Sequence, residues 1–565
     1  MAEVLLSPGV LARENDQSFV SGQPVQAGAA IVGPTVKGPV GIPTVVSSFS
    51  DYKNKFGCIV ESGSAEYTYF TSISAYNYFQ QGGNSLLVTR VVSGSYTAAT
   101  STAIQNDVES GVLENLSGVN ASAFNATGSA AGTKSNISAS NVNVTASIII
   151  AESSSFTSAT LVAATGSFNV GDTVIFTSQS LGADQSGGAD LTLTLVDANI
   201  TNQTAFVLET LSEGEITNSG TATGSNGTLI SGSKDNLRWE VVSPNTASGT
   251  FSLLIRRGDD TQTSKTVLET WSDLSLDPNS NNYIEKIIGN STQTVTQDSG
   301  TGEYYVKNAG TYNTLSNFVR VKSVASKTLN YFDNNGDAKN EYTASIPLAG
   351  SGSFTGAVGK PFAGAQPGLF YENIGNNDTQ GLHPDNYAVS LNLLANKDAY
   401  RYNLITAPGL CNNITGHASA ITTMINNSSF RGDNIAVIDL VKYSAEINTV
   451  TAQATSRDTS YAAAYWPWLQ TIDPDLGGLV WVPASAMIPG VYAFNDRAGE
   501  AWFAPAGLNR GGLGTVVRAE RKLTNGNRDT LYGSNVNPIA TFPNTGVVVF
   551  GQKTLQKKAS ALDRV

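Results

Sequence analysis

Apolar positions near the N-terminus predict a strand, a helix and a second strand. Between residues 21 and 63, short apolar stretches are broken by Gly and Pro, which indicates strands and turns. Residues 64–81 place apolar side chains at helical spacing, and the helix is expected to end at Gly82 because glycine favours helix termini. The apolar stretch 86–92 is then a strand, and such alternation is typical of an α/β domain.

The same alternation returns in the C-terminal third of the chain. The predicted helices span 385–399, 412–426 and 461–469, and the predicted strands span 402–407, 434–441 and 478–482. Because both ends of the chain carry this pattern, residues 21–97 and 370–565 are predicted to form one discontinuous α/β core. Residues 1–20 are predicted to be an extended arm, since Pro8 disfavours an early helix.

Two segments between these ends are predicted to be insertions into the core. Residues 98–235 are rich in Ser, Thr, Asn and Gly, and their short apolar stretches have the length of strands. This segment is predicted to be an all-β sandwich or barrel. Residues 236–369 begin with two apolar stretches that would pair as strands, so they are predicted to be an α+β insertion that ends in a linker over 349–369.

Charge is scarce in this chain and mostly negative. Only 14% of the 565 residues are charged, against about 25% in a typical domain, and the formal net charge is −12. This balance argues against a nucleic-acid surface, which would need a basic patch. A basic strip remains near the C-terminus, formed by Arg518, Arg521, Lys522, Lys553, Lys557 and Lys558. The strip is either a solvated face or a contact for an acidic partner.

The cysteines and the N-terminus bear on the compartment. Cys58 and Cys411 are far apart in the sequence and are expected to be isolated buried thiols, with a single disulfide as the alternative. The first residues lack the basic and apolar regions of a signal peptide. No apolar stretch is long enough to span a membrane. The protein is therefore expected to fold in a cytoplasm.

The sequence carries little that could support catalysis. The two histidines, His383 and His417, leave few candidates for a general base. No cluster of Cys and His has the spacing of metal ligands. We therefore predict no catalytic residue, no cofactor, no metal and no enzymatic activity.

Three further patterns have plain structural interpretations. Residues 333–337 resemble a calcium loop but lack its spacing, so a turn is expected. Gly359-Lys360 lacks the first glycine and the Ser/Thr of a phosphate-binding loop. Core packing is the expected role of the tryptophans in the last third of the chain, which are Trp466, Trp468, Trp481 and Trp502.

Motifs at both ends of the chain carry a resemblance to a known family. The C-terminal motif residues are Pro483, Ser485, Asp496, Trp502, Pro505, Gly507, Asn509, Arg510, Asn537, Pro538, Gly551, Thr554, Asp563 and Arg564. The N-terminal motif residues are Ser7, Pro8, Gly9, Gly33, Gly38, Pro39, Phe56 and Gly57. In this order and at these intervals, the chain resembles the contractile phage tail sheath family.

The resemblance implies a structural subunit that polymerises as stacked rings around a tail tube and contracts to drive the tube through the host envelope. The implied partners are further copies of the chain, the tube protein, and baseplate and tail terminator proteins. The implied location is the contractile tail of a virion, assembled in the host cytoplasm. Members of the family exchange terminal arms that add strands to a neighbour's sheet, and they carry outward-facing insertions, here residues 98–235.

Two alternatives stay open at the level of sequence. One is the sheath of a tailocin or of another contractile injection system. The other is a surface adhesin or glycan-binding protein, which the Ser/Thr/Asn-rich region would suit. Sheath proteins of this type continue past the Asp563-Arg564 motif, so a further segment after Val565 is expected.

Overall fold

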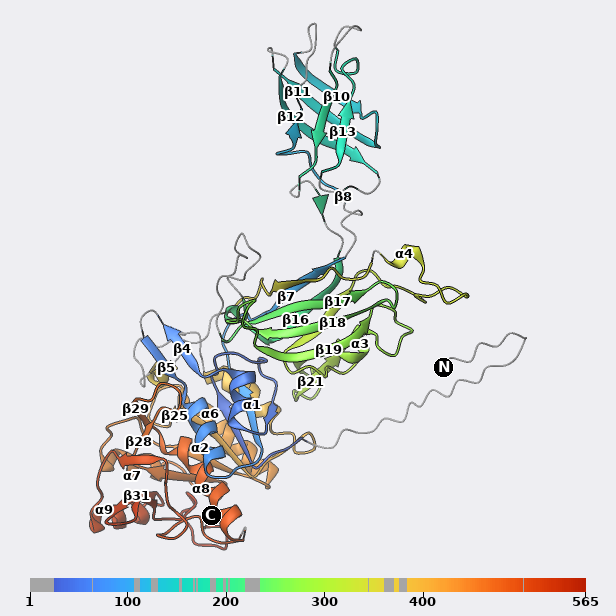
Figure 1. The fold of residues 1–565 in the computed structure, drawn as a ribbon. Coiled ribbons are helices and arrows are strands. Elements are labelled where there is room, and N and C mark those ends of the chain that lie inside the picture. Colours follow the sequence, from blue (N-terminus) through green and yellow to red (C-terminus); the bar gives the residue numbers. More distant parts are fainter. Residues whose placement is uncertain are drawn as a thin grey trace.

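Three units follow one another in space in the computed structural model of the chain (Figure 1). A core unit (residues 25–90 and 370–564) lies at one end, an outer unit (112–201) at the other, and a middle unit (98–105 and 204–359) between them. The structure describes residues 25–62, 65–105, 112–122, 131–151, 155–165, 168, 171–182, 189–196, 200–201, 204–218, 234–343, 345–359, 370–374, 384–500 and 502–564. The predicted arm, residues 1–20 with Ser7, Pro8 and Gly9, lies outside these ranges.

An eight-stranded sheet built from both ends of the chain forms the centre of the core unit. Its order is β3-β6-β2-β25-β26-β27-β31-β32, and the six inner strands are parallel while the two edge strands are antiparallel. The strands are β2 (Ala29–Gly33), β3 (Thr44–Val46), β6 (Leu86–Arg90), β25 (Leu404–Cys411), β26 (Ile435–Asp439), β27 (Ala462–Trp466), β31 (Asn537–Phe542) and β32 (Gly546–Val549).

Helices and small sheets surround this central sheet. The helices are α1 (Phe49–Phe56), α2 (Phe70–Gln80), α5 (Pro384–Leu393), α6 (His417–Arg431), α7 (Ile447–Thr455), α8 (Ala484–Ala498) and α9 (Asn525–Gly533), with a 3-10 turn η4 (Phe370–Asn373). The smaller pairings join β1 (Val25–Gln26) to β24 (Tyr400–Arg401), β4 (Ile59–Ser62) to β5 (Ala65–Thr68), and β28 (Leu469–Ile472) to both β29 (Leu479–Val482) and β30 (Val516–Ala519). Helices α2 and α8 pack together against the sheet, and α5 and α6 form a second pair.

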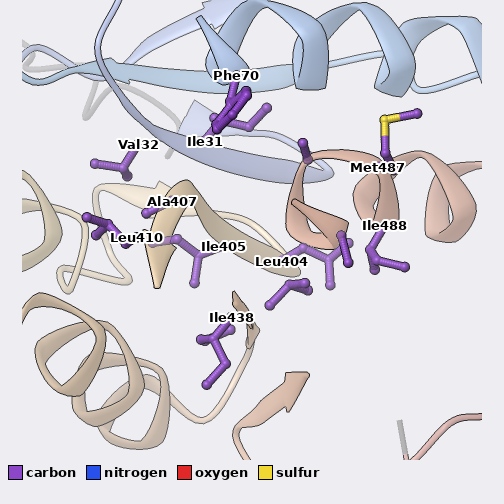
Figure 2. Close-up of a cluster of buried hydrophobic side chains, with 14 of the residues drawn as sticks. Ile31, Val32, Phe70, Leu404, Ile405, Ala407, Leu410, Ile438, Met487 and Ile488 are labelled. Carbon is purple, nitrogen blue, oxygen red and sulfur yellow. The ribbon is translucent and has the colours of Figure 1, made fainter. Parts of the chain in front are cut away.

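Burial on both faces explains the composition of the central strands. All five residues of β2 and all eight of β25 are buried, as expected for parallel strands covered by helices on both sides. Figure 2 shows Ile31 and Phe70, from the N-terminal end of the chain, in the same hydrophobic cluster as Leu404, Ile438 and Met487 from the C-terminal end. The two ends of the chain therefore share one hydrophobic core.

The middle unit packs two sheets around its own hydrophobic core. Sheet β22-β16-β7 faces sheet β19-β18-β17-β23, and Phe206 of β16 stacks on Phe251 of β18 with ring centroids 5.6 Å apart. The strands are β7 (Ala98–Ile104), β16 (Thr204–Glu213), β17 (Leu237–Asn245), β18 (Thr250–Arg257), β19 (Val267–Ser275), β22 (Val319–Val324) and β23 (Gly350–Ser353), with a separate hairpin of β20 (Thr292–Gln297) and β21 (Tyr304–Ala309). Short helical turns complete the unit, namely η3 (Glu215–Thr217), α3 (Ile284–Ile287) and α4 (Asn340–Thr343).

The outer unit consists of strands, and its described residues contain no helix. Two three-stranded sheets, β10-β11-β12 and β13-β14-β9, enclose a third hydrophobic cluster, and the pair β8–β15 lies nearest the middle unit. The strands are β8 (Val112–Leu113), β9 (Asn120–Ala121), β10 (Gly132–Ser138), β11 (Val144–Ile150), β12 (Phe156–Ala164), β13 (Thr173–Phe176), β14 (Leu191–Thr194) and β15 (Ile200–Thr201). Across the described residues, the mixed content of helices and strands in several sheets agrees with the predicted α/β character of the chain.

The predicted boundaries of the two insertions differ from the structure. Strands β7 and β16 lie inside the predicted all-β segment 98–235, yet β16 pairs with both β7 and β22 and belongs to the middle unit. The reason is tertiary, because Phe206 and Leu208 are buried against strands that lie far along the chain. The predicted linker 349–369 likewise begins as β23, which pairs with β17.

One predicted helix is wrong, and three others begin or end elsewhere. Residues 461–469 form β27 and the start of β28, and every position of β27 is buried inside the sheet. A short apolar stretch of Ala, Tyr and Trp does not distinguish a buried strand from a buried helix. The helices predicted at 385–399 and 412–426 correspond to α5 and α6, and the one at 64–81 starts only at Phe70 because β5 precedes it.

Candidate functional site

Aromatic side chains occupy the place where an open parallel sheet usually binds a ligand. That place lies at the carboxyl ends of the strands where the strand order reverses, here between β2 and β25. Phe70, Tyr371 and Trp468 fill it, with ring centroids 5.0–5.9 Å apart. A Cβ added at Gly409, near the end of β25, would lie 3.1 Å from Tyr371 and 3.2 Å from Phe70. Aromatic side chains thus pack against one another and against Gly409 in this crevice.

A buried serine, aspartate and histidine lie close to this position. Ser485, at the start of α8, donates through both its backbone N and its Oγ to the carboxylate of Asp439 at the end of β26. His417 instead accepts a hydrogen bond from the Cys411 backbone N at Nδ1 (3.0 Å), so its Nε2 carries the proton and donates to the Ile374 carbonyl oxygen. Both ring nitrogens of His417 are thus engaged by backbone groups, and the three side chains do not form a Ser–His–Asp triad. His383 lies outside the described residues.

Burial moves the pKa values of Asp439 and His417 in opposite directions. It raises the pKa of Asp439 to about 6, although the Ser485 hydrogen bonds oppose this, and it lowers the pKa of His417 to about 4. The contribution of neutral His417 to the free energy of unfolding is therefore lost as the pH falls from 6.5 towards 4. The contribution of Asp439 to the free energy of unfolding increases over nearly the same range of falling pH, because its carboxyl group becomes protonated in the folded state first.

We expect the variant His417→Gln to gain stability relative to wild type on acidification. Glutamine keeps one acceptor and one donor but does not titrate, so the stability difference should rise by about 3 kcal/mol between pH 7 and pH 4. Urea unfolding at a series of pH values measures this difference. Asp439→Asn is the matched control and should change in the opposite sense, whereas parallel pH profiles for both variants and the wild type would contradict the assignment.

The Trp502–Arg510 motif covers the edge of the central sheet. The Gly507 backbone N donates to the Val549 carbonyl oxygen (2.8 Å), and the Val549 N donates to the Gly511 carbonyl oxygen (2.7 Å). Beside this ladder, the Arg510 guanidinium lies 3.9 Å from the centre of the Phe503 ring. An uncovered edge strand would offer free backbone groups to other chains, so this segment closes the β32 side of the sheet.

Glycine is required at position 511 of this cover. A Cβ there would lie 2.4 Å from the Val549 carbonyl oxygen and 2.9 Å from the Gly507 backbone N. Pro505 is buried, whereas Asn509 and Leu508 are exposed. Trp502 is 78% exposed, so the prediction that it packs in the core is wrong, while Trp466 and Trp468 are buried as predicted.

Asn537, Gly551 and Thr554 of the C-terminal motif hold the segment after β32 against β31. The Asn537 side chain donates to the Lys553 carbonyl oxygen (2.7 Å) and accepts from the Lys553 backbone N (2.6 Å). A Cβ at Gly551 would meet Asn537 Oδ1 at 2.8 Å, so this close approach needs glycine. Thr554 Oγ1 donates to the Leu562 carbonyl oxygen (3.0 Å) and closes a loop over residues 554–562.

The remaining C-terminal motif residues lie at separate positions in the core unit. Pro483 precedes α8, Asp496 is exposed near its end, and Pro538 follows Asn537 in β31. Lys553 forms an isolated bridge with Arg564, whose side chain pairs with the neighbouring Asp563 at 3.4 Å.

Four residues of the N-terminal motif, Gly38, Pro39, Phe56 and Gly57, lie at the joint between the core and middle units. Gly38, with φ +113°, lies against Phe56, and Gly57 ends α1. The fully buried Arg90 guanidinium donates to the carbonyl oxygens of Gly38 (2.7 Å) and Glu213 (2.8 Å). This cation thereby ties the two units together.

A polar cavity of about 420 Å³ lies beside the joint, with Pro39 in its wall. The Lys37–Asp235 ion pair (3.3 Å) also bridges the units there. Gly33, the last N-terminal motif residue of the described chain, lies at the end of β2 against Thr71. Sequence analysis missed Arg90, although its position inside the apolar stretch 86–92 is a signal that could have found it.

The described residues bear on the predictions about the cysteines, metal sites, membrane-spanning segments and the basic strip. Cys58 and Cys411 are free buried thiols, as predicted. In the part of the chain that the structure describes, no group of three or more His, Cys, Asp or Glu side chains could hold a metal ion, and no helix could cross a membrane. Within the basic strip, Arg521 pairs with Glu446 and Arg518 lies over Trp481, whereas Lys557 and Lys558 are exposed.

Residues 384–555 match the family model described as "Phage tail sheath protein central domain". The tail sheath protein of Vibrio phage KVP40 is 40% identical over 85 residues, which cover 15% of this chain and 13% of that protein. The tail sheath protein of Salmonella phage ViI is 32% identical over 109 residues, which cover 19% of this chain and 17% of that protein. The matched regions thus span far less than two thirds of the length of these relatives.

Solved structures of sheath proteins are also similar to this chain. The sheath tail protein of Listeria innocua aligns over 95% of this chain and 70% of its own, with a TM-score of 0.42 and 9% identity. The sheath complex of an extracellular contractile injection system in its contracted state aligns over 28% of this chain and 41% of its own, with a TM-score of 0.23 and 27% identity.

Proposed function

We propose that this chain, which belongs to the tail sheath family through residues 384–555, is the structural subunit of a contractile tail sheath. The family match carries the proposal, and it confirms the resemblance drawn from the C-terminal motifs. In this role the chain polymerises as stacked rings around the tail tube and contracts to drive the tube through the host envelope. It acts as a structural polymer subunit, without enzymatic chemistry.

The arrangement of the units supports this role. The core unit contains the matched domain, and Figure 1 shows the outer unit at the far end of the molecule from it. We infer that the core units form the wall of the sheath and that the outer unit faces outwards. Residues 1–20 would act as the arm that adds a strand to a neighbour.

The proposal also names partners and a location. They are further copies of the chain, the tube protein, and the baseplate and tail terminator proteins, in the contractile tail of a virion assembled in the host cytoplasm. Nucleic acid is not among them, because the net charge of −12 disfavours contact with phosphates.

Negative-stain electron microscopy of the purified chain over a concentration series tests the proposal. We expect rings or helical tubes that become more frequent as the concentration rises, because association follows mass action. Sedimentation velocity on the same samples measures the fraction assembled. A chain that remains monomeric at every concentration, both alone and with tube protein added, would show that the proposed function is wrong.

A further inference from the structure

A second cavity of about 350 Å³ opens between the β4–β5 and β28–β29 hairpins of the core unit. Its walls include the aromatic side chains of Tyr67, Tyr443, Trp468 and Trp481. Its rim carries the acidic Glu66 and the apolar Leu479. Leu479 is 60% exposed. An apolar, aromatic recess of this kind on a protein surface marks a contact site rather than ordinary surface.

One polar group in the cavity has no partner. Thr68 lines the cavity and is 3% exposed, and among the described residues its Oγ1 makes no hydrogen bond. A buried hydroxyl without a partner costs free energy, which a donor entering the cavity would recover. The site therefore favours an occupant that carries a hydrogen-bond donor.

The surroundings of the cavity favour a cation as that donor. The Glu66 carboxylate is exposed on the rim. The aromatic ring faces attract positive charge, and Arg518 already lies 5.3 Å from the centre of the Trp481 ring. A lysine side chain would fit this combination, since its ammonium donates hydrogen bonds while its aliphatic part packs on apolar walls.

The chain itself carries such lysines on a prominent loop. Residues 497–565 contain ten basic and four acidic side chains, a net charge of +6, although the whole chain carries −12. Lys557, Lys558 and the residues up to Leu562 are all exposed, and Leu562 is 57% exposed.

The loop is also held in place before any partner binds. The Lys557 backbone N donates to Asp458 Oδ1 (2.9 Å), and the Leu562 carbonyl oxygen accepts from Thr554 Oγ1 (3.0 Å). A loop that is already ordered loses little conformational entropy on binding.

We propose that the aromatic cavity receives the Lys557–Leu562 loop of a second copy of the chain. A lysine ammonium of the loop donates to Thr68 Oγ1 and pairs with Glu66, and Leu562 packs on Leu479. Figure 1 places the C-terminus and the β4–β5 hairpin well apart on the core unit, so the contact forms between copies. Two different surfaces then meet head to tail, which extends into rings or filaments. The inference rests on the proposed function and names one contact of the polymer.

Charge exchange in the full-length chain tests this contact. Glu66→Lys alone, and Lys557→Glu with Lys558→Glu, should each weaken self-association about tenfold, as expected for the loss of a close charge pair. All three substitutions combined should recover most of the loss. Sedimentation velocity at low and high salt measures the association, and the wild-type contact should weaken as salt rises.

Thr68→Val isolates the hydrogen bond, because valine has the same shape without the hydroxyl. The variant should have the same free energy of unfolding as wild type, since the hydroxyl that it lacks makes no hydrogen bond among the described residues of one copy. It should nevertheless associate about tenfold more weakly. Glu303→Lys and Lys307→Glu, on the exposed β20–β21 hairpin, are the controls for charge alone and should associate normally. If the wild type assembles and the cavity and loop variants assemble equally well, the inference is wrong while the proposed function stands. A wild-type chain that never assembles contradicts both.

Discussion

Replacing Trp468 by alanine is expected to lower the free energy of unfolding of the core unit by about 3–5 kcal/mol. The side chain is 3% exposed, and its ring lies 5.0 Å from the centre of Tyr371 and 5.9 Å from those of Phe70 and Tyr443. Its Nε1 donates to the Val441 carbonyl oxygen (3.0 Å). Alanine would leave a large hole and an unpaired carbonyl where α2, η4 and the ends of the parallel strands meet. Urea unfolding followed by circular dichroism measures the loss.

Two comparisons separate this effect from a general intolerance of substitution. Trp502→Ala removes the same side chain from a position that is 78% exposed, and it should change stability by less than about 0.5 kcal/mol. Indole added to the Trp468→Ala protein should raise its unfolding temperature and leave wild type unchanged, because the cavity would fit the missing ring. Equal stability of the two alanine variants would show that the aromatic cluster does not support the fold.

The contrast between these two tryptophans shows what sequence reasoning could resolve. Both lie in apolar surroundings along the chain, and core packing was expected for both. Only the tertiary structure distinguishes them, since Trp468 is covered by helices and turns from distant parts of the chain. Trp502 lies at the start of the segment that covers β32 and is exposed. Burial of a single aromatic residue is decided by elements that the local pattern does not contain.

Elements with a distinct apolar stretch were easier to predict. The parallel strands β2, β6 and β25 are continuous apolar stretches, and α2 carries apolar residues at helical spacing, so local pattern and tertiary environment agree. At β27 the pattern was ambiguous, and burial on both faces of the sheet decided for a strand. At β16 the local prediction of a strand was correct, but its partners β7 and β22 could not be read from its sequence.

The candidate site was predicted only as a set of motif positions. Sequence order does not show that Gly507 and Gly511 pair with β32, because that pairing depends on how residues 499–513 return to the sheet. It also does not show that Ser485 contacts Asp439 instead of a histidine. The cavity beside Trp481 joins two hairpins that are about 400 residues apart in the chain, so no local pattern could reveal it.

Replacing Arg256 by methionine is expected to destabilise the middle unit by about 3–5 kcal/mol, because it removes the guanidinium that lies between two buried carboxylates. Glu240 then keeps only Lys265 (2.7 Å) and Asp260 only the more distant Arg238 (3.9 Å) as counter-ions. The guanidinium is fully buried and donates from Nε and Nη2 to both oxygens of Asp260, at 2.7 and 2.9 Å. Its Nη1 donates to Glu240 and Gln262, each at 3.0 Å, and Nη2 also reaches the Thr261 carbonyl oxygen at 3.1 Å. One side chain thus organises the loop after β18. Hydrogen exchange over residues 237–275 should report faster exchange in the variant.

A neighbouring arginine provides the matched control for Arg256. Arg257 carries the same charge one position along β18, but its side chain is 44% exposed and pairs with Asp259 on the surface. Arg257→Met should therefore cost less than about 1 kcal/mol. Adding Asp260→Asn to Arg256→Met should restore part of the lost stability, because it removes a buried carboxylate whose remaining counter-ion, Arg238, lies 3.9 Å away. If Arg257→Met destabilised the unit as much as Arg256→Met, total charge would matter more than the buried network. If Asp260→Asn deepened the loss, the carboxylate would have found another partner, and hydrogen exchange near Thr266, whose backbone N donates to Asp260, would distinguish these cases.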